Sequence, residues 1–132
     1  MRTFTNCGTP NYIAPEVLKG VGSSFEADIW SLGVLMCELL SGKTPFHDED
    51  PQKVYDNVIN CRPRYAPSVS ALVRSLLNTI FVGDPGFRAS LDQIKMHPVF
   101  KRIDWEDAKN RELDTPFIPN ESDAYHNCNN RA

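Results

Sequence analysis

The stretch from Ile29 to Leu40 constrains the fold more than any other part of this 132-residue chain. Its twelve residues are apolar on nearly every helical face, and Glu38 is the one charged residue among them. A helix without a polar stripe is a buried helix, around which other helices pack. Asp28 stands at the expected N-cap, and Gly42 stands where the chain turns out of the helix. The stretch is too short to span a bilayer, so it predicts the central buried helix of a globular domain.

The other patterns predict further helices and no convincing strand, so the predicted fold class is all-α. Pro51 suits the first position of a helix. Ser90 and Gln93 form the capping box of a short helix near the end of the domain. Together with the clean apolar periodicity after residue 69, these signals predict helices over residues 14–18, 51–59, 69–80 and 90–97.

Charge and composition exclude several classes of protein. The chain has 14 Lys and Arg against 17 Asp and Glu, a net charge of −3, whereas a nucleic-acid-binding domain shows a basic excess. With 41% hydrophobic and 23% charged residues, the chain is not collagen-like, coiled-coil or fully disordered. The N-terminus lacks the apolar core of a signal peptide, which favours a cytoplasmic location.

Residue spacing alone points to no reaction. The four cysteines lie far apart without histidine partners, so we expect reduced thiols at Cys7, Cys37, Cys61 and Cys128. No glycine-rich phosphate loop and no metal-spaced histidine cluster occurs, and each histidine is expected to be a surface or capping group. We therefore expect this chain to bind no cofactor and no metal by itself.

A series of motifs goes further. Residues 7–16, Cys-Gly-Thr-Pro-Asn-Tyr-Ile-Ala-Pro-Glu, resemble the end of a protein-kinase activation segment, which closes on Ala-Pro-Glu. Residues 27–34 match the buried central helix of the kinase large lobe, and residues 42–46 match the turn after it. Arg88 stands where that family places the arginine that pairs with the Ala-Pro-Glu glutamate, here Glu16. The order of the motifs indicates the C-terminal half of a kinase large lobe.

Later segments are similar to the AGC group of serine/threonine kinases. Residues 97–100, 103–105 and 116–119 resemble the end of the large lobe and the first part of the C-terminal tail in that group. Within the group, residues 2–8 and 50–55 are most similar to the cAMP- and cGMP-dependent kinases.

The resemblance divides the chain into three parts. It implies the end of the activation segment with a substrate-docking loop at 1–26 and a helical large-lobe subdomain at 27–100. The third part is an extended AGC-type tail at 101–132, which is expected to be disordered after about residue 120.

Two threonines have roles by resemblance. Thr5 is the phosphorylation site, where a phosphate of about −1.5 to −2 charge orders the loop by binding arginines. The alternative for Thr5 is an exposed threonine in a polar loop. Thr9 supports the reaction by bridging the catalytic Asp and Lys of a catalytic loop that is expected before Met1.

Five residues are expected to bind the substrate peptide. Gly8, Pro10 and Ile13 shape the apolar pocket for the residue that follows the target hydroxyl. Glu38 binds an arginine upstream of the target Ser or Thr, and Tyr12 helps to orient Glu38. A carboxylate on an apolar helix is costly to bury unless it is paired, so a local basic partner is the alternative for Glu38.

Three residues are assigned to structure. Asp28 is expected to hold the catalytic-loop backbone in addition to capping its own helix. Glu16 and Arg88 are expected to form a buried bidentate ion pair.

The resemblance implies a partial serine/threonine kinase of AGC type that carries only the peptide-docking and activation-loop part. The glycine-rich loop, the strand lysine, the catalytic-loop Asp and Asn and the metal-binding Asp would all lie N-terminal to Met1. ATP and Mg are therefore expected for the full-length kinase, and this chain alone is expected to be inactive. The alternative is a non-catalytic, kinase-like interaction module that binds peptides or a kinase partner.

The implied partners follow from the same resemblance. They are protein substrates with Arg upstream of Ser or Thr, and the missing N-terminal half of the kinase domain. A regulatory subunit or a cyclic-nucleotide-binding domain is also implied, whereas nucleic acid and membrane are not expected as partners.

Overall fold

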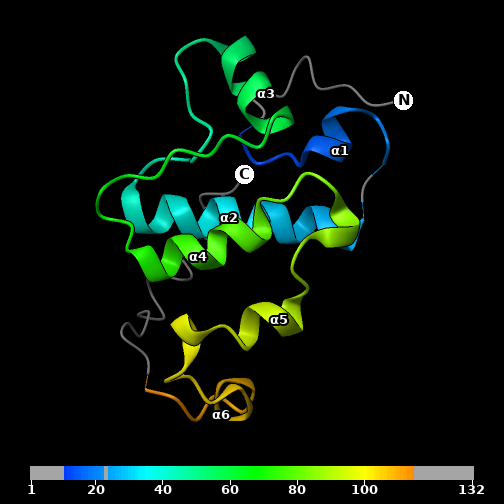
Figure 1. Ribbon diagram of the computed structural model, residues 1–132. Helices are drawn as coiled ribbons and strands as arrows, with labels where there is room; N and C mark the ends of the chain where they lie inside the picture. The colour runs from blue at the N-terminus through cyan, green and yellow to red at the C-terminus, as the bar shows by residue number, and fades with distance from the viewer. Residues whose placement is uncertain (1–10, 23, 115–132) are drawn as a thin grey trace, which may run out of the picture. The chain divides into compact units, whose positions relative to one another are not determined.

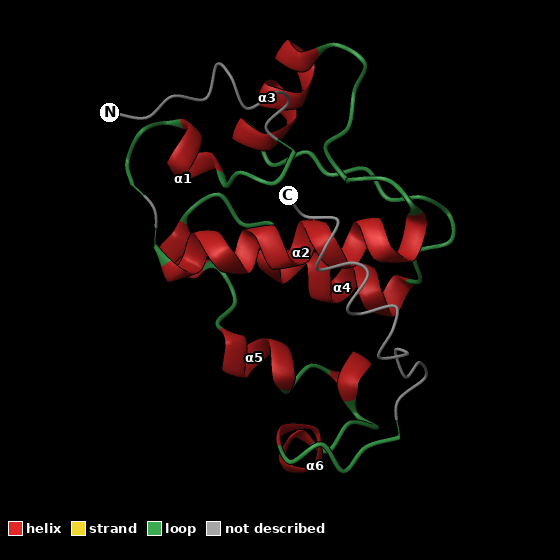
Figure 2. Ribbon diagram, turned by 180° about the vertical axis from the view of Figure 1, so that it is seen from behind, coloured by secondary structure: helices red, strands yellow, loops and turns green. Residues whose placement is uncertain are grey.

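The computed structural model describes residues 11–22 and 24–114. At its centre, helix α2 (Phe25–Ser41) packs against helix α4 (Ala71–Ile80), which runs in the opposite direction (Figure 1). Helices α3 (Pro51–Ile59) and α5 (Leu91–Lys95) lie on opposite sides of this pair in both views (Figure 2). The described residues form helices and loops and contain no strand, which confirms the predicted all-α fold class.

Shorter elements connect and follow these helices: α1 at Pro15–Leu18, the 3-10 helices η1 at Pro85–Phe87 and η2 at Pro98–Phe100, and α6 at Trp105–Lys109. The described residues up to Lys101 belong to one compact unit, and those from Arg102 to residue 114, which include α6, belong to a second unit. None of the helices in the described residues is long and apolar enough to cross a membrane.

Helix α6 lies in the segment that the sequence predicts as the tail. The Asp104 side chain accepts hydrogen bonds from the backbone N–H groups of Glu106, at 3.0 Å, and Asp107, at 3.2 Å. Asp104 therefore caps the helix, and the two acidic residues of the first turn suit the positive end of the helix dipole.

Three aromatic rings form the centre of the core in the first unit. Trp30, Phe46 and Phe81 have ring centroids 5.1 to 5.2 Å apart, with Trp30 stacked on Phe46 and Phe81 edge-on to both. Gly33 allows α2 to approach α4, because a Cβ at this position would lie 2.6 Å from Cγ2 of Ile80. A glycine inside a helix costs about 1 kcal/mol in helix propensity. The close packing of the two helices offsets that cost.

Helix α2 is the predicted buried central helix, but part of its surface is exposed. Trp30, Val34 and Cys37 are at most 1% exposed, whereas Leu39 and Leu40 are 75% and 52% exposed. A uniformly apolar sequence indicates that a helix can be buried anywhere around its axis, but it does not indicate which sides find partners.

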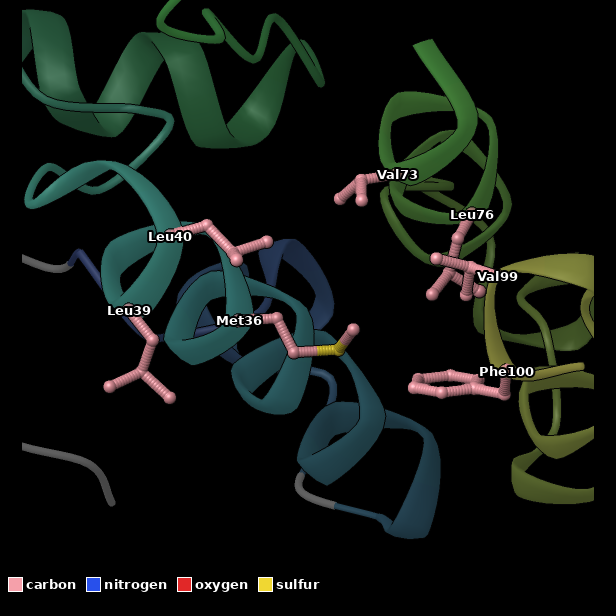
Figure 3. Close-up of a pocket in the computed structure, with 7 residues that line it drawn as sticks. All are labelled: Met36, Leu39, Leu40, Val73, Leu76, Val99 and Phe100. Atoms are coloured by element: carbon pink, nitrogen blue, oxygen red, sulfur yellow. The ribbon is translucent and has the colours of Figure 1, made fainter. Parts of the chain in front are cut away.

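The exposed leucines border a groove between α2, α4 and η2, which we call the apolar groove (Figure 3). Its volume is about 290 Å³, and its lining is apolar throughout: Met36, Leu39, Leu40, Val73, Leu76, Val99 and Phe100. The side chains of Met36 and Phe100 point toward each other across the groove (Figure 3).

Several helix ends agree with the sequence prediction. Pro51 occupies the first position of α3, as predicted, directly after the N-cap Asp50. Ser90 and Gln93 form the predicted capping box of α5. Gly42 ends α2 in the left-handed conformation, with φ at 77°, which a residue with a Cβ rarely adopts.

The beginning of α2 differs from the prediction. The N-cap is Ser24, not Asp28, and the backbone N–H of Ala27 already bonds to the Ser24 carbonyl oxygen at 3.1 Å. Asp28 is exposed and lies in the first turn, where its charge still suits the helix dipole. The prediction failed because the residues just before Asp28 do not extend the apolar pattern of the helix. They contain no helix-breaking residue, however, so the helix begins earlier, at Phe25.

Two further boundaries also differ. Helix α4 begins at Ala71, after the N-cap Ser70, two residues later than the periodicity suggested. Helix α5 ends at Lys95, and His97 caps η2 by accepting the Val99 N–H at Nδ1 over 3.1 Å. A proline after His97 stops the helix and opens this short 3-10 turn.

Candidate functional site

Tyr12 ties the segment before α1 to helix α2. Ser31 Oγ donates a hydrogen bond to the Tyr12 carbonyl oxygen at 2.7 Å, and the Tyr12 hydroxyl donates to Glu38 Oε2. Ser31 and Glu38 are separated by about two helical turns, so both lie on one face of α2. Tyr12 is therefore held both at its backbone and at the end of its side chain.

A second contact ties the same segment to the turn after α2. Thr44 Oγ1 donates a hydrogen bond to Asn11 Oδ1 at 3.1 Å. A hollow of about 290 Å³, which we call the polar pocket, is lined by Asn11, Glu38, Gly42, Lys43, Thr44 and His47. Glu38 supplies the carboxylate among these lining residues.

Glu38 is half-buried and available to a ligand. One of its oxygens, Oε2, accepts from Tyr12, and no lysine or arginine forms an ion pair with it within residues 11–22 and 24–114. The hydrogen bond to Glu38 raises the pKa of the Tyr12 hydroxyl, with smaller contributions from desolvation and from the Glu38 charge. Tyr12 therefore remains a donor that orients the carboxylate.

A buried ion pair between Glu16 and Arg88 anchors the chain directly after the Tyr12 segment. Arg88 donates to both oxygens of Glu16, at 2.8 and 2.9 Å, and its side chain is 0% exposed. The remaining guanidinium N–H groups donate to the carbonyl oxygens of Glu26 and Val82 at 2.7 to 3.1 Å. All five donors of Arg88 are thus used. The guanidinium also lies over the Trp30 ring, 5.1 Å from its centroid.

The ion pair keeps Glu16 charged. Burial alone would raise the pKa of this carboxyl. The hydrogen bonds from Arg88 and from its own backbone N–H, with the Arg88 charge, outweigh burial and lower the pKa below its ordinary value. The structure therefore brings the predicted residues Glu16 and Arg88 together as an ionised, bidentate pair.

The other predicted site residues have varied positions. Ile13 is half-buried beside Tyr12, and Asp28 is exposed on the first turn of α2. Four predicted residues of the activation segment, together with Cys7, lie outside the described residues: Thr5, Gly8, Thr9 and Pro10.

The described residues present no reactive thiol and no metal centre. Burial raises the pKa of the Cys37 and Cys61 thiols, and both cysteines are free. In the part of the chain that the structure describes, no three His, Cys, Asp or Glu side chains are grouped so that they could hold a metal ion.

Sequence reasoning gave no site role to five residues that the structure places here: Asn11, Ser31, Lys43, Thr44 and His47. Ser31 has a recognisable signal, because it lies on the same helical face as Glu38. Lys43, Thr44 and His47 have no such signal, because their positions depend on how the turn after α2 folds back toward Asn11.

Comparison with known proteins identifies the family. Residues 2–100 match the model described as the protein kinase domain, and the chain belongs to this family. The elements from α1 to η2, the ion pair and the polar pocket lie within the matched residues and are therefore parts of a protein kinase domain.

Individual relatives are much longer than this chain. It is 38% identical to "Protein kinase C delta type" of Rattus norvegicus over 119 residues, which cover 89% of this chain and 18% of the relative. It is 42% identical over 120 residues to the "RAC family serine/threonine-protein kinase homolog" of Dictyostelium discoideum, which cover 90% of this chain and 27% of the relative. It is 33% identical over 130 residues to the "cAMP-dependent protein kinase catalytic subunit 3" of Drosophila melanogaster, which cover 95% of this chain and 22% of the relative. The chain thus spans less than a third of each relative.

Proposed function

We propose that this chain is the peptide-docking part of an AGC-type serine/threonine protein kinase, which transfers the γ-phosphoryl group of ATP to Ser or Thr in proteins. The observation that carries the proposal is the Glu38 carboxylate, held by Tyr12 at the polar pocket. The similarity to relatives named as a serine/threonine-protein kinase homolog, a protein kinase C and a cAMP-dependent protein kinase supports the class of reaction.

Glu38 has the properties of a receptor for arginine. A guanidinium binds a carboxylate through short, charge-assisted hydrogen bonds, which are about twice as strong as neutral ones. The alternative, a local basic partner for Glu38, finds no support among the described residues, because none of their lysines or arginines pairs with it. A substrate arginine upstream of the target hydroxyl is therefore the proposed partner.

The remaining activation-segment assignments belong to the same proposal. Phosphorylation of Thr5, support of the reaction by Thr9, and an apolar subsite formed by Gly8, Pro10 and Ile13 stay predictions. The ion pair of Glu16 with Arg88 supports them indirectly, because it anchors the chain directly after these residues.

The nucleotide chemistry lies outside the residues of this site. ATP and Mg²⁺ would supply the phosphoryl group and neutralise its charge in the complete kinase domain. The inactivity of this chain by itself stays a prediction from the family resemblance. Titration of residues 1–132 with Mg-ATP in a calorimeter should give no saturable heat, and saturable binding would contradict this assignment.

The branch within the AGC type is a narrower hypothesis. The cyclic-nucleotide-dependent branch, with a regulatory subunit or cyclic-nucleotide-binding domain, has no specific support, since the relatives named above include three kinds of kinase at 33% to 42% identity. Stimulation of the full-length kinase by cAMP or cGMP would support that branch. A cytoplasmic location remains part of the proposal.

The test of the proposed function uses the full-length kinase that contains this chain. We expect ATP-dependent phosphorylation of a serine peptide with an upstream arginine, and about tenfold lower kcat/KM when that arginine is alanine. Glu38→Gln should remove this preference, whereas Glu49→Gln, a matched change at an exposed glutamate outside the pocket, should keep it. An active kinase that ignores the arginine would contradict the role of Glu38.

A further inference from the structure

The polar pocket combines one carboxylate with two basic side chains. Glu38 borders it from α2, while Lys43 and His47, both exposed, border it from the turn after that helix. Among the described residues, no ion pair joins Lys43 to Glu38. An arginine bound to Glu38 would therefore share the pocket with the Lys43 ammonium, which forms no ion pair with a described carboxylate.

Asn11 adds to this asymmetry. Its side-chain oxygen already accepts the hydrogen bond from Thr44, so its amide N–H groups are the part that remains for a ligand. A carboxylate at this position would offer further acceptors to a second cation, whereas asparagine offers donors. Asn11 and Lys43 thus both favour an anionic group close to the arginine that Glu38 receives.

The size of the pocket limits what can enter. Its volume of about 290 Å³ is slightly below the range for small-molecule sites, which begins at about 300 Å³. It is suited to the ends of one or two peptide side chains. The charged and polar groups that line the pocket then determine which pairs of substrate side chains bind there.

We propose that the polar pocket selects substrates in which the arginine bound by Glu38 is accompanied by an acidic residue, whose carboxylate is received by Lys43 and Asn11. This inference rests on the proposed function, because it assumes that Glu38 binds a substrate arginine. A neighbouring Asp or Glu compensates the Lys43 charge and accepts hydrogen bonds from Asn11. A second arginine or lysine in the same place meets the Lys43 ammonium and is disfavoured.

A structural role for Lys43 makes a different prediction. Lys43 follows the end of α2, where a cation interacts favourably with the negative end of the helix dipole. That interaction would affect the stability of the helix and leave the choice between peptides unchanged. Peptide selectivity therefore separates the two roles.

The test measures kcat/KM of the full-length kinase for a set of serine peptides. The set contains an arginine peptide with alanine neighbours and its Arg→Ala version. It also contains versions with Asp or with a second Arg placed one or two residues to either side of the arginine. At the best position, we expect the Asp peptide to exceed the matching double-arginine peptide about fivefold, as for a partly exposed ion pair.

Variants at Lys43 then assign this preference to the pocket. Lys43→Glu should lower the ratio of the Asp to the double-arginine peptide by about tenfold, since attraction becomes repulsion. Lys43→Arg should keep the ratio. Lys53→Glu is the matched control, because Lys53 is an exposed lysine on α3 that does not line the pocket, and it should leave the ratio unchanged.

The outcomes distinguish this inference from the proposed function. Equal rates for the arginine peptide and its Arg→Ala version would contradict the proposed function and the inference together. A clear arginine preference with equal rates for the Asp and double-arginine peptides, unchanged in Lys43→Glu, would overturn the inference alone. A shift in Lys53→Glu as large as that in Lys43→Glu would indicate a general charge effect and would also overturn it.

Discussion

The polar pocket and the apolar groove have the same volume, about 290 Å³ each, and both border the last turns of α2. Glu38 lines the first, whereas Met36, Leu39 and Leu40 line the second. Hydrogen bonds from Tyr12 and Thr44 organise the polar pocket, but the groove has no polar group in its lining. Directional groups define the chemistry of a ligand, while an apolar surface indicates only that burial is favourable.

The largest expected effect concerns the ion pair of Glu16 and Arg88, which anchors the segment next to the polar pocket. Glu16→Gln leaves the buried Arg88 guanidinium without its charged partner, so we expect a loss of about 3 to 5 kcal/mol in the free energy of unfolding. Urea unfolding of the protein at neutral pH measures this loss. Glu49→Gln, at an exposed glutamate, should change it by less than about 0.5 kcal/mol. Similar small losses for both variants would show that the pair does not hold the segment.

The same pair predicts how this difference depends on pH. The folded-state pKa of Glu16 is lower than its ordinary value, so its charged form stabilises the fold at and above neutral pH. This contribution decreases as the pH falls below the ordinary glutamate range and through the folded pKa. The gap between the wild type and Glu16→Gln should therefore narrow in acid, and a gap that widened would contradict the assigned charge.

The next prediction compares a buried and an exposed leucine in the apolar groove. Leu76 is 1% exposed and Leu39 is 75% exposed, although both line the groove. Leu76→Ala leaves a cavity and should cost about 2 to 5 kcal/mol. Leu39→Ala should cost less than about 0.5 kcal/mol. If unfolding of the full-length protein showed equal losses, the exposed part of the groove would be covered there, and the contrast with the polar pocket would disappear.

The smallest effect concerns the polar contacts that hold η2 at the edge of the groove. His97 accepts the Val99 N–H at Nδ1, and its Nε2 lies 3.0 Å from Ser75 Oγ. His97→Ala should cost about 1 kcal/mol, as for the loss of an N-cap. His97→Asn should recover most of that loss, because its side-chain oxygen can accept the same N–H. Equal unfolding midpoints for the two variants would show that the Ser75 contact is the important one.

The helices were largely predictable from the sequence, whereas their surroundings were not. The periodicity around Leu76 and the caps at Asp50 and Ser90 are local signals, and the structure contains the corresponding helices. The one-sided burial of α2 depends on which partners exist, which a uniformly apolar helix does not encode. Helix α6 was missed because its five residues are too short for a periodic pattern, although Asp104 was an available N-cap signal.

The candidate site was less predictable from its residues alone. Glu38 stands out as a carboxylate on an apolar helix, but its link to Tyr12 was expected only from the family resemblance. The contact between Asn11 and Thr44 joins positions 33 apart and follows from no local pattern. Long-range polar contacts of this kind depend on the completed fold. The sequence therefore predicted Glu38 as a site residue but not the other polar residues that line the pocket.

The ion pair of Glu16 and Arg88 also bears on the order of folding. It joins positions 72 apart in the chain. Closing so long a loop costs more chain entropy than closing a helical turn, so the local helices are expected to form first and the pair to close last. Interactions that form after the transition state slow unfolding and leave the folding rate nearly unchanged. We therefore expect this pair to lengthen the lifetime of the folded docking segment.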